Sequence, residues 1–386
     1  ASTMRNFSVY NPTRLHFGSG QLSRLSEEIP PGSRVFALHG GAGILQSGLW
    51  DEVQRSLPDV SLSRFGAVEA NPQYDTLLRA VSQASKERCD FILSIGGDAL
   101  IHAGKFLAAA LCHSGDPLQL LCGAPIRAAL PLGCVLSLPL GSALGNTQGL
   151  VSHAERQQKL PFASPLLHPR FAILDTRPHL DWPARQLAQA TVEAFDHALS
   201  HYLPATPADP LQARYAESLL LTLIETGPAA QANPDAEDAR ASLLWCVLQT
   251  RQGPLGYGMP RDRSARLIGQ QLGALYHLTA AQSLALILPA LLGEYREIRR
   301  DRLLQYAERV WQLRDGSAAQ RMDDAIAATA ELFGRLGLAT RLSEHGLDAE
   351  VVPEVLAQLQ RHGLVGAGDQ SELDLDLCER VLLRAL

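Results

Sequence analysis

Residues 91–107 read Phe-Ile-Leu-Ser-Ile-Gly-Gly-Asp-Ala-Leu-Ile-His-Ala-Gly-Lys-Phe-Leu, and this stretch decides the fold class. It begins as an apolar run typical of a buried strand, and after Gly96 and Gly97 the pattern is typical of a helix. α/β proteins bind phosphate groups at such a turn, because the backbone N–H groups of the helix N-terminus are free there. Asp98 follows the turn directly, and its carboxylate would repel the anion that the turn favours.

Composition limits the class of protein. At 386 residues, with 46% hydrophobic and 19% charged residues, the chain is long enough for two globular domains. A net charge of −6 and a pI near 6.1 argue against a nucleic-acid or anionic-membrane partner.

No apolar run reaches the roughly 18–20 residues that a membrane span needs. With no signal peptide, and six widely spaced cysteines that predict free thiols, we expect a cytoplasmic protein. Residues 1–3, before Met4, are interpreted as an expression remnant.

Strand and helix patterns alternate through the first 177 residues. Residues 4–18 are typical of an edge hairpin. Beyond them the patterns predict strands at 34–38, 61–65, 91–95, 135–138 and 170–175, and helices at 21–29, from near Leu49, and at 72–88. This alternation predicts a doubly wound parallel sheet, which binds ligands at the carboxyl ends of its strands.

From residue 178 onward the pattern is helical. Apolar residues recur at spacings of three and four, with almost no strand candidates between them. The predicted helices are 183–203, 211–225, 236–252, 261–275, 280–299, 301–313, 317–336 and 351–362. We therefore predict an α/β domain over residues 4–177 and an all-helical domain over residues 178–386.

Two glycine turns follow predicted strands, at Gly40-Gly41 and at Gly96-Gly97. A phosphate or ribose contact is one interpretation of Gly40 and Gly41. Glycine also serves the geometry of any strand-to-helix turn, so the functional and structural interpretations stand about even. Lys105, one helical face away from the second turn, either binds an anion or is a solvated helix lysine.

Glu193 and His197 are four residues apart in a predicted helix and therefore share one face. An acid and an imidazole so placed can bind a divalent metal. A solvated pair is the better interpretation unless further ligands join, since metal sites need three or four. His277 is a suitable extra ligand, whereas the amide of Gln270 is a poor one for iron or zinc. The sequence lacks Gly-x-Ser-x-Gly, Walker and HExxH motifs, which argues against hydrolases and kinases.

Segments spread over the whole chain also match one family in order. They are Asn6-Phe7 with Pro12-Thr13-Arg14, Glu69–Pro72, Ser94–Gly97 with Lys105, Leu138-Pro139, Val192–His197 and Gln305–Trp311. Together they resemble the iron-containing (group III) alcohol dehydrogenases, in the branch of butanol dehydrogenases and NADPH-dependent aldehyde reductases. The resemblance implies the dehydroquinate synthase-like architecture: a dinucleotide-binding α/β domain, a helical metal-binding domain, a cleft between them and often a dimer. It also implies NAD(P) and a divalent iron or zinc ion as cofactors.

The resemblance assigns roles to particular residues of this chain. Those assigned to the dinucleotide are Gly40, Gly41, Gly96, Gly97, Asp98, Lys105, Ser142, Asn146 and Lys159. Those at metal positions are Glu193, His197 and Gln270, and His277 and His102 are the candidates for acid–base catalysis.

The cofactor positions depart from the family pattern. The family's pyrophosphate turn is Gly-Gly-Gly-Ser followed by an acid three residues later, whereas this chain has Asp98, Ala99 and His102 at the last three of these places. Two like charges about 4 Å apart repel by roughly 4 kcal/mol at an effective dielectric constant near 20. A polar lining of the family is replaced by Ala143 and Leu144.

The metal positions depart as well. The family uses one aspartate and three histidines, of which this chain keeps only His197. Glu193 stands for the aspartate, Gln270 and Ala280 stand for the other two histidines, and Tyr276 replaces a further histidine near the substrate. Such a site is expected to lose most of its affinity for iron or zinc.

The first glycine turn bears on the choice of cofactor. NADPH-using members of the family have a serine and a lysine where this chain has Gly43 and Leu45, which favours NAD over NADP.

Three hypotheses on function follow. The departures favour weak or absent oxidoreductase activity and a repurposed, regulatory or partner-binding role, with a homodimer or a hetero-oligomer with an active relative as the assembly. The alternatives are a working NAD(P)-dependent alcohol dehydrogenase or aldehyde reductase with a non-standard metal site, and different acid–base chemistry on a small molecule in the same cleft.

Overall fold

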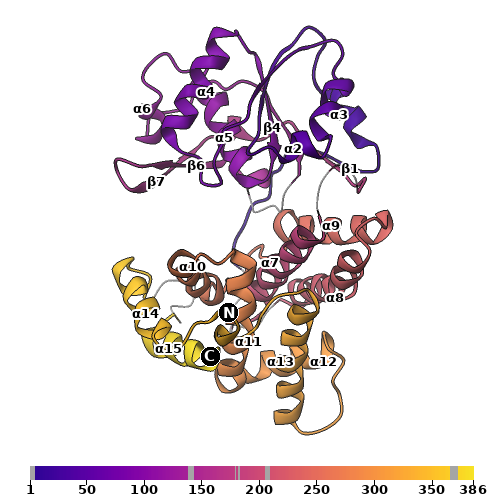
Figure 1. Ribbon diagram of the computed structural model, residues 1–386, viewed down its shortest axis with the longest axis vertical. Helices are drawn as coiled ribbons and strands as arrows, with labels where there is room; N and C mark the ends of the chain where they lie inside the picture. Colours follow the sequence, from indigo (N-terminus) through magenta and orange to yellow (C-terminus); the bar gives the residue numbers. More distant parts are fainter. Residues whose placement is uncertain (1–4, 138–142, 179, 181–182, 205–208, 366–372) are drawn as a thin grey trace. The chain divides into compact units, whose positions relative to one another are not determined.

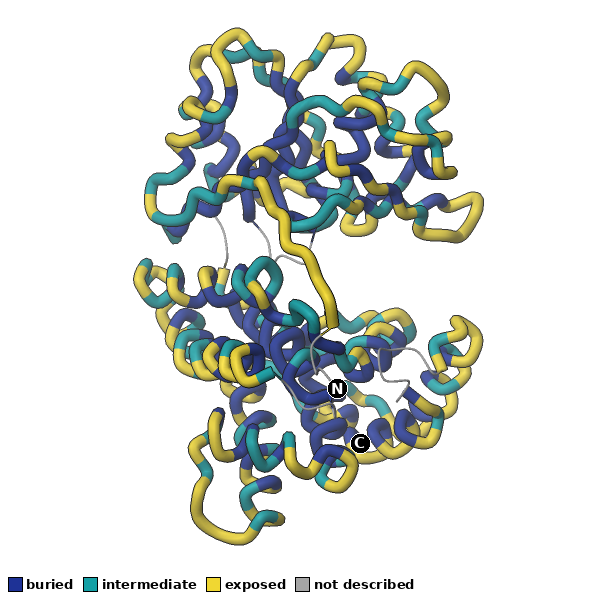
Figure 2. Tube along the Cα trace, turned by 180° about the vertical axis from the view of Figure 1, so that it is seen from behind, coloured by how far each residue is buried: buried dark blue, intermediate teal, exposed yellow. Residues whose placement is uncertain are grey.

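The chain folds into two compact units (Figures 1 and 2). The computed structural model describes residues 5–137, 143–178, 180, 183–204, 209–365 and 373–386. Residues 9–183 and 235–241 form an α/β unit, and the described residues of 1–8, 184–234 and 242–386 form a helical unit. Within each unit the buried residues lie inside and the exposed residues lie mainly on its loops and outer helix faces (Figure 2). The predicted fold class is confirmed.

The α/β unit is built on a six-stranded parallel sheet with the strand order β1-β8-β5-β4-β2-β3. Its strands are β1 (Arg14–Gly18), β2 (Arg34–Leu38), β3 (Ser61–Phe65), β4 (Phe91–Gly96), β5 (Leu132–Leu136) and β8 (Phe171–Asp175). Its helices are α1 (Leu25–Glu28), α2 (Gly43–Gln46), α3 (Leu49–Ser56), α4 (Tyr74–Lys86), α5 (Asp98–Ala110) and α6 (Leu118–Leu121). The predictions for β2 and β3 are confirmed with their bounds.

Packing on both faces of β4 explains the apolar run that opens the decisive stretch. Ile92 belongs to a core that α4 and α5 help to form, whereas Leu93 and Ile95 belong to a second core that includes residues of α3. Successive side chains of a strand point to opposite faces, so a strand covered on both faces needs apolar residues at every position. The helices of the α/β unit surround the sheet in Figure 1.

The predicted edge hairpin over residues 4–18 is wrong. Residues 5–13 form neither strand nor helix, and β1 is an edge strand paired parallel with β8. The side chain of Asn11 accepts a hydrogen bond from Thr13 N at 3.0 Å, which makes a local turn around Pro12. Phe7, Val9 and Tyr10 are 51–74% exposed, so the apolar alternation that suggested a strand faces solvent instead of a partner strand.

An antiparallel hairpin that the sequence analysis missed follows β5. It consists of β6 (Gln148–His153) and β7 (Gln158–Ala163). Gly149 pairs with Phe162 and Leu150 with Pro161 in this hairpin. Glycine and proline are depleted in strands, which hid the pattern.

The helical unit is organised around α11 (Ala280–Ile298), which packs against α7, α10, α12, α13 and α15. The other long helices are α7 (Ala184–Tyr202), α8 (Pro210–Ala232), α9 (Glu237–Gln252), α10 (Ser264–Tyr276), α12 (Arg300–Arg309), α13 (Ala318–Arg335), α14 (Val351–Arg361) and α15 (Leu375–Arg384). α15 was not predicted. No helix in the described ranges has the length and apolarity that crossing a membrane requires.

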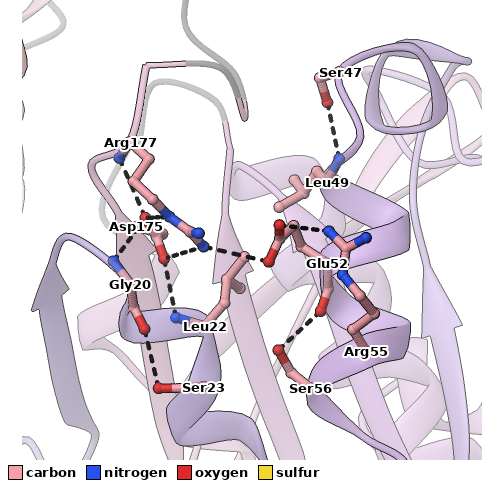
Figure 3. Close-up of polar contacts among 10 residues, drawn as sticks. All are labelled: Gly20, Leu22, Ser23, Ser47, Leu49, Glu52, Arg55, Ser56, Asp175 and Arg177. Carbon is pink, nitrogen blue, oxygen red and sulfur yellow. Dashed lines mark hydrogen bonds and ion pairs between the residues drawn. The ribbon is translucent and has the colours of Figure 1, made fainter.

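A buried carboxylate ties the end of β8 to the start of the chain's first helical segment (Figure 3). Asp175 accepts hydrogen bonds from Gly20 N at 3.2 Å and Leu22 N at 3.1 Å, and from Arg177 Nε at 2.9 Å. Arg177 also lies 3.5 Å from Glu52 of α3. Burial alone would raise the pKa of Asp175, but the hydrogen bonds from Arg177 and Leu22 outweigh burial and hold it below its ordinary value.

Replacing Asp175 by alanine should lower the free energy of unfolding by about 2–3 kcal/mol, because several donors lose a charged acceptor. Glu27→Ala is the matched control: it removes an exposed pair with Arg24 and should cost less than about 1 kcal/mol. Urea denaturation measures both. Equal losses in the two variants would contradict this account of the Asp175 network.

The stability that Asp175 contributes should depend on pH. Because the folded pKa of Asp175 lies below its unfolded value of about 3.9, the stability that this residue contributes is complete above the unfolded pKa. It is lost as the pH falls through the folded pKa. Urea midpoints of the wild type and Asp175→Ala should therefore converge at acidic pH, and a constant difference down to pH 2 would be inconsistent with the lowered pKa.

Candidate functional site

The second glycine turn has the geometry that the sequence predicts. Gly96 ends β4 with a φ of 151°, and a Cβ there would lie 2.9 Å from two side-chain atoms of Leu100, so this position requires glycine. Gly97 is the N-cap of α5, and Asp98 is the first residue of the helix. A carboxylate in the first turn suits the positive end of the helix dipole. The turn therefore places a carboxylate at the helix end that would attract the anion of a ligand.

Lys105 is held by the protein itself. Its side chain is fully buried, and Nζ donates to Ala143 O at 2.6 Å, Gln148 O at 2.8 Å, and Asn146 O and Oδ1 at 2.9 and 3.1 Å. Burial lowers the pKa of Lys105 to about 8, which leaves it mostly charged at neutral pH. Its ammonium thus anchors residues 143–148 to α5. The interpretation of Lys105 as a solvated lysine is therefore wrong, and a contact with an anion stays a prediction.

His102 lies near the same anchor. Burial, with the charges of Lys105 and Lys159, lowers the pKa of His102 to about 4. Its Nδ1 is enclosed and has no hydrogen-bond partner in the described part of the chain. His102 is therefore neutral at physiological pH. Ser142, also assigned to the cofactor, lies outside the described residues.

The first glycine turn is shaped by a buried histidine. His39 Nε2 lies 3.1 Å from Arg64 Nη1, and His39 Nδ1 lies 3.2 Å from Gly41 O. A guanidinium only donates, so Nε2 accepts and the Nδ1 proton is donated to Gly41 O. A Cβ at Gly41 would meet nothing within 4 Å. Packing therefore does not explain this glycine, and the functional interpretation of Gly41 stays a prediction.

In the helical unit, the predicted metal residue His197 contacts an arginine. It is buried on α7, and its Nδ1 lies 3.0 Å from Arg251 Nη1 of α9. Because the guanidinium only donates, Nδ1 is the acceptor and the ring proton is on Nε2. Burial first, and then the charges of Arg251 and Arg261, keep the pKa of His197 far below its ordinary value.

Further cations surround this imidazole. Arg261 Nε donates to Ser200 Oγ at 3.0 Å, one turn along α7 from His197. The charges of Arg261 and Arg266 both act on His197 and on the fully buried Asp196. Burial raises the pKa of Asp196, and the arginines oppose that shift. The sequence analysis missed all three arginines, because arginine is not a metal ligand and the search followed the ligands.

Two more predicted site residues, Gln270 and His277, lie on α10 and at its end. Gln270 of α10 is exposed, and so is His277, which caps α10 in a left-handed conformation with a φ of 57°. Tyr276 donates a hydrogen bond to Glu354 of α14. Within the described ranges, no group of three or more His, Cys, Asp or Glu side chains is arranged to hold a metal ion.

These residues do not fit a divalent iron or zinc ion. Both ring nitrogens of His197 are used, one as an acceptor from Arg251 and one as the carrier of the proton, so the imidazole offers no lone pair. Metal ligands must also be unprotonated and are favoured by nearby negative charge, whereas three guanidinium groups act here. The family resemblance implies a divalent metal, but the residues present around His197 are not suited to bind one.

The chain is similar to known proteins over nearly its full length. A family model described as iron-containing alcohol dehydrogenase matches residues 12–176, and one described as Fe-containing alcohol dehydrogenase family, C-terminal, matches residues 187–370. The NADPH-dependent aldehyde reductase YqhD of Escherichia coli is 38% identical over 98% of this chain and 99% of its own. A probable NADH-dependent butanol dehydrogenase of Bacillus subtilis is 29% identical over 94% and 95%. The structure of YqhD without substrate and cofactor superposes with a TM-score of 0.91, covering 99% of this chain and 100% of that one.

The Lys105 anchor predicts a structural defect. Lys105→Met should lower the free energy of unfolding by at least about 3 kcal/mol, because several buried carbonyl groups lose their donor. Lys86→Met, at the exposed end of α4, is the control and should change it by less than about 0.5 kcal/mol. Urea denaturation, with hydrogen exchange at residues 143–148, measures the effect. A Lys105→Met protein of wild-type stability would show that the anchor is dispensable.

Proposed function

Because the chain belongs to the iron-containing alcohol dehydrogenase family, we propose that it is an NAD(P)-dependent oxidoreductase that interconverts aldehydes and alcohols. The observation that carries this proposal is the relationship over nearly the full length of both chains to a protein named as an aldehyde reductase. It favours the alternative of a working enzyme over the repurposed role that the departures at single positions suggested.

A reduced nicotinamide, when bound, would supply the hydride that converts an aldehyde to an alcohol, and the new hydroxyl would take its proton from solvent or a side chain. In the α/β unit, Gly96 and Gly97 allow the backbone to turn closely, and the first turn of α5 offers N–H groups to a pyrophosphate. The neutral His102 is unsuited to donate a proton at physiological pH. No step is assigned to a metal, because the residues around His197 do not fit one.

The choice between the two nicotinamide cofactors rests on α2. The family's phosphate-binding serine and lysine are replaced by Gly43 and Leu45, and Leu45 is 41% exposed. Neither side chain carries a charge for the additional phosphate of NADP, so we propose NADH as the better cofactor. The relatives are named with both cofactors: YqhD with NADPH and the butanol dehydrogenase with NADH.

Asp98 makes the proposal testable. Fluorescence titration with NADH and NADPH should show binding to the wild type that tightens at least about tenfold in Asp98→Asn, because the variant removes repulsion of the pyrophosphate. The matched control is Asp75→Asn, since Asp75 is an exposed acid in the first turn of α4. Its cofactor affinity should be unchanged.

Activity decides between the hypotheses. Purified wild-type protein should oxidise NADH or NADPH when a short-chain aldehyde is added, at a rate that rises in proportion to enzyme. Absence of cofactor oxidation with a panel of aldehydes, in protein that binds the cofactor, would reject the oxidoreductase and support the repurposed role.

A further inference from the structure

Arg64 is a cation at the ligand-binding end of the sheet that the proposed reaction does not use. It is the penultimate residue of β3, where it pairs with Ala37 of β2. Its side chain is exposed, and within the described ranges it forms no ion pair with a carboxylate. Many exposed arginines lack an acid partner, so the evidence for a role lies in how this one is held.

Two contacts fix the guanidinium of Arg64. Its Nη1 donates to Nε2 of the buried His39 at 3.1 Å. Its Cζ lies 5.8 Å from the centre of the Trp50 ring, which is within the range of a cation–π contact. The first contact uses one N–H donor of several, and the second uses one face. Donors therefore remain for a ligand on a side chain whose position the protein already sets, which lowers the entropy cost of binding.

His39 links Arg64 to the first glycine turn. Its Nδ1 donates to Gly41 O at 3.2 Å, so one imidazole ring separates the guanidinium from the turn. A Cβ at Gly66 would lie 2.5 Å from Cε1 of His39, so the ring also packs against the segment after β3. A Cβ at Gly41 would meet nothing within 4 Å. The cation is thus held beside backbone that a ligand can approach closely.

The strand order places this cation next to the strand that carries the second glycine turn. β2 lies between β4 and β3, and the three strands are parallel, so their carboxyl ends meet at one edge of the sheet. In doubly wound folds that bind a dinucleotide, the pyrophosphate lies at the glycine turn of one strand and the adenosine ribose at the end of its neighbour. An acid at the second place binds a ribose hydroxyl, whereas an arginine accommodates the additional phosphate of NADP.

The segments at this strand end contain no acidic residue. Residues 39–43, after β2, and residues 66–68, after β3, include neither aspartate nor glutamate. The first acid after β3 is Glu69, and it accepts a hydrogen bond from Thr76 of α4 at 2.7 Å. No carboxylate of these two segments would therefore repel an anion that lies beside Arg64.

We infer that Arg64 binds the additional phosphate of NADPH and thereby makes NADPH a second usable cofactor beside NADH. A guanidinium presents paired N–H donors that match the oxygen atoms of a phosphate. Gly43 and Leu45 of α2 offer this phosphate no charge, so the cation comes from β3 instead. This role of Arg64 rests on the proposed function, because it requires a dinucleotide at this edge of the sheet.

Binding measured without turnover tests this role. In fluorescence titrations of the full chain, Arg64→Met should weaken NADPH at least about tenfold, because the phosphate loses a charged donor, and should change NADH less than about twofold. The retained NADH affinity also shows that the variant is folded. Arg34→Met is the matched control, since Arg34 is exposed at the opposite end of β2, and both affinities should equal those of the wild type.

A conservative variant separates the charge from its geometry. Arg64→Lys keeps the positive charge and loses the paired donors, so its NADPH affinity should lie between those of the wild type and Arg64→Met. An affinity for NADPH as low as that of Arg64→Met would overturn the role of the charge.

The same titrations supply the outcomes that would overturn the inference. Equal weakening of both cofactors in Arg64→Met would mean that Arg64 has only a structural role, and unchanged NADPH affinity would mean that it has no role in binding. A wild type that binds NADH but not NADPH would also overturn the inference and leave the proposed function standing. A wild type that binds neither cofactor would reject both.

Discussion

The buried ammonium of Lys105 is the contact on which the glycine-turn side of the α/β unit depends. It links α5, which begins at the glycine turn, to the segment that leads into β6, through bonds of 2.6–3.1 Å to four oxygen atoms. Those carbonyl groups have left water and need a donor, and a lysine reaching across from α5 supplies it. Lys105 thereby fixes residues 143–148 against the helix that begins at the glycine turn.

The helical unit shows how one donor-only side chain can change what a site binds. His197 alone would be a sound metal ligand, since a neutral imidazole offers a lone pair. The guanidinium of Arg251 takes that lone pair and leaves only an N–H, and Arg261 and Arg266 add positive charge. The fold that this chain shares with its relatives can therefore place a donor against a side chain that a metal would need as a ligand. Fold alone does not fix the chemistry of a site.

Sequence patterns predicted most of the regular structure. β2 was predicted to the residue, because an unbroken apolar run has few other uses in an α/β protein. β3 was also predicted to the residue, although its residues are exposed or only partly buried. The β6–β7 hairpin was missed because Gly149 and Pro161 break the strand pattern. The edge hairpin failed for the opposite reason: an alternating pattern near Tyr10 does not reveal whether a partner strand exists.

The site was less predictable than the fold. The sequence correctly placed Glu193 and His197 one turn apart on a helix, but the partner of His197 lies 54 residues away on α9, and pairing over that distance leaves no local pattern. Lys105 was likewise located without its role, since its acceptors are mostly backbone carbonyl groups that any residue carries. What a side chain does depended here on contacts that only the folded chain brings together.

The central claim is the proposal that this family member reduces its substrate without a divalent metal at His197. The most direct test is the rate of NADH-dependent reduction of a short-chain aldehyde by one preparation, measured before and after removal of metal ions with a chelator and verified by elemental analysis. The account predicts the same rate in both samples. A rate that is lost on chelation and restored by zinc or ferrous ion would contradict it.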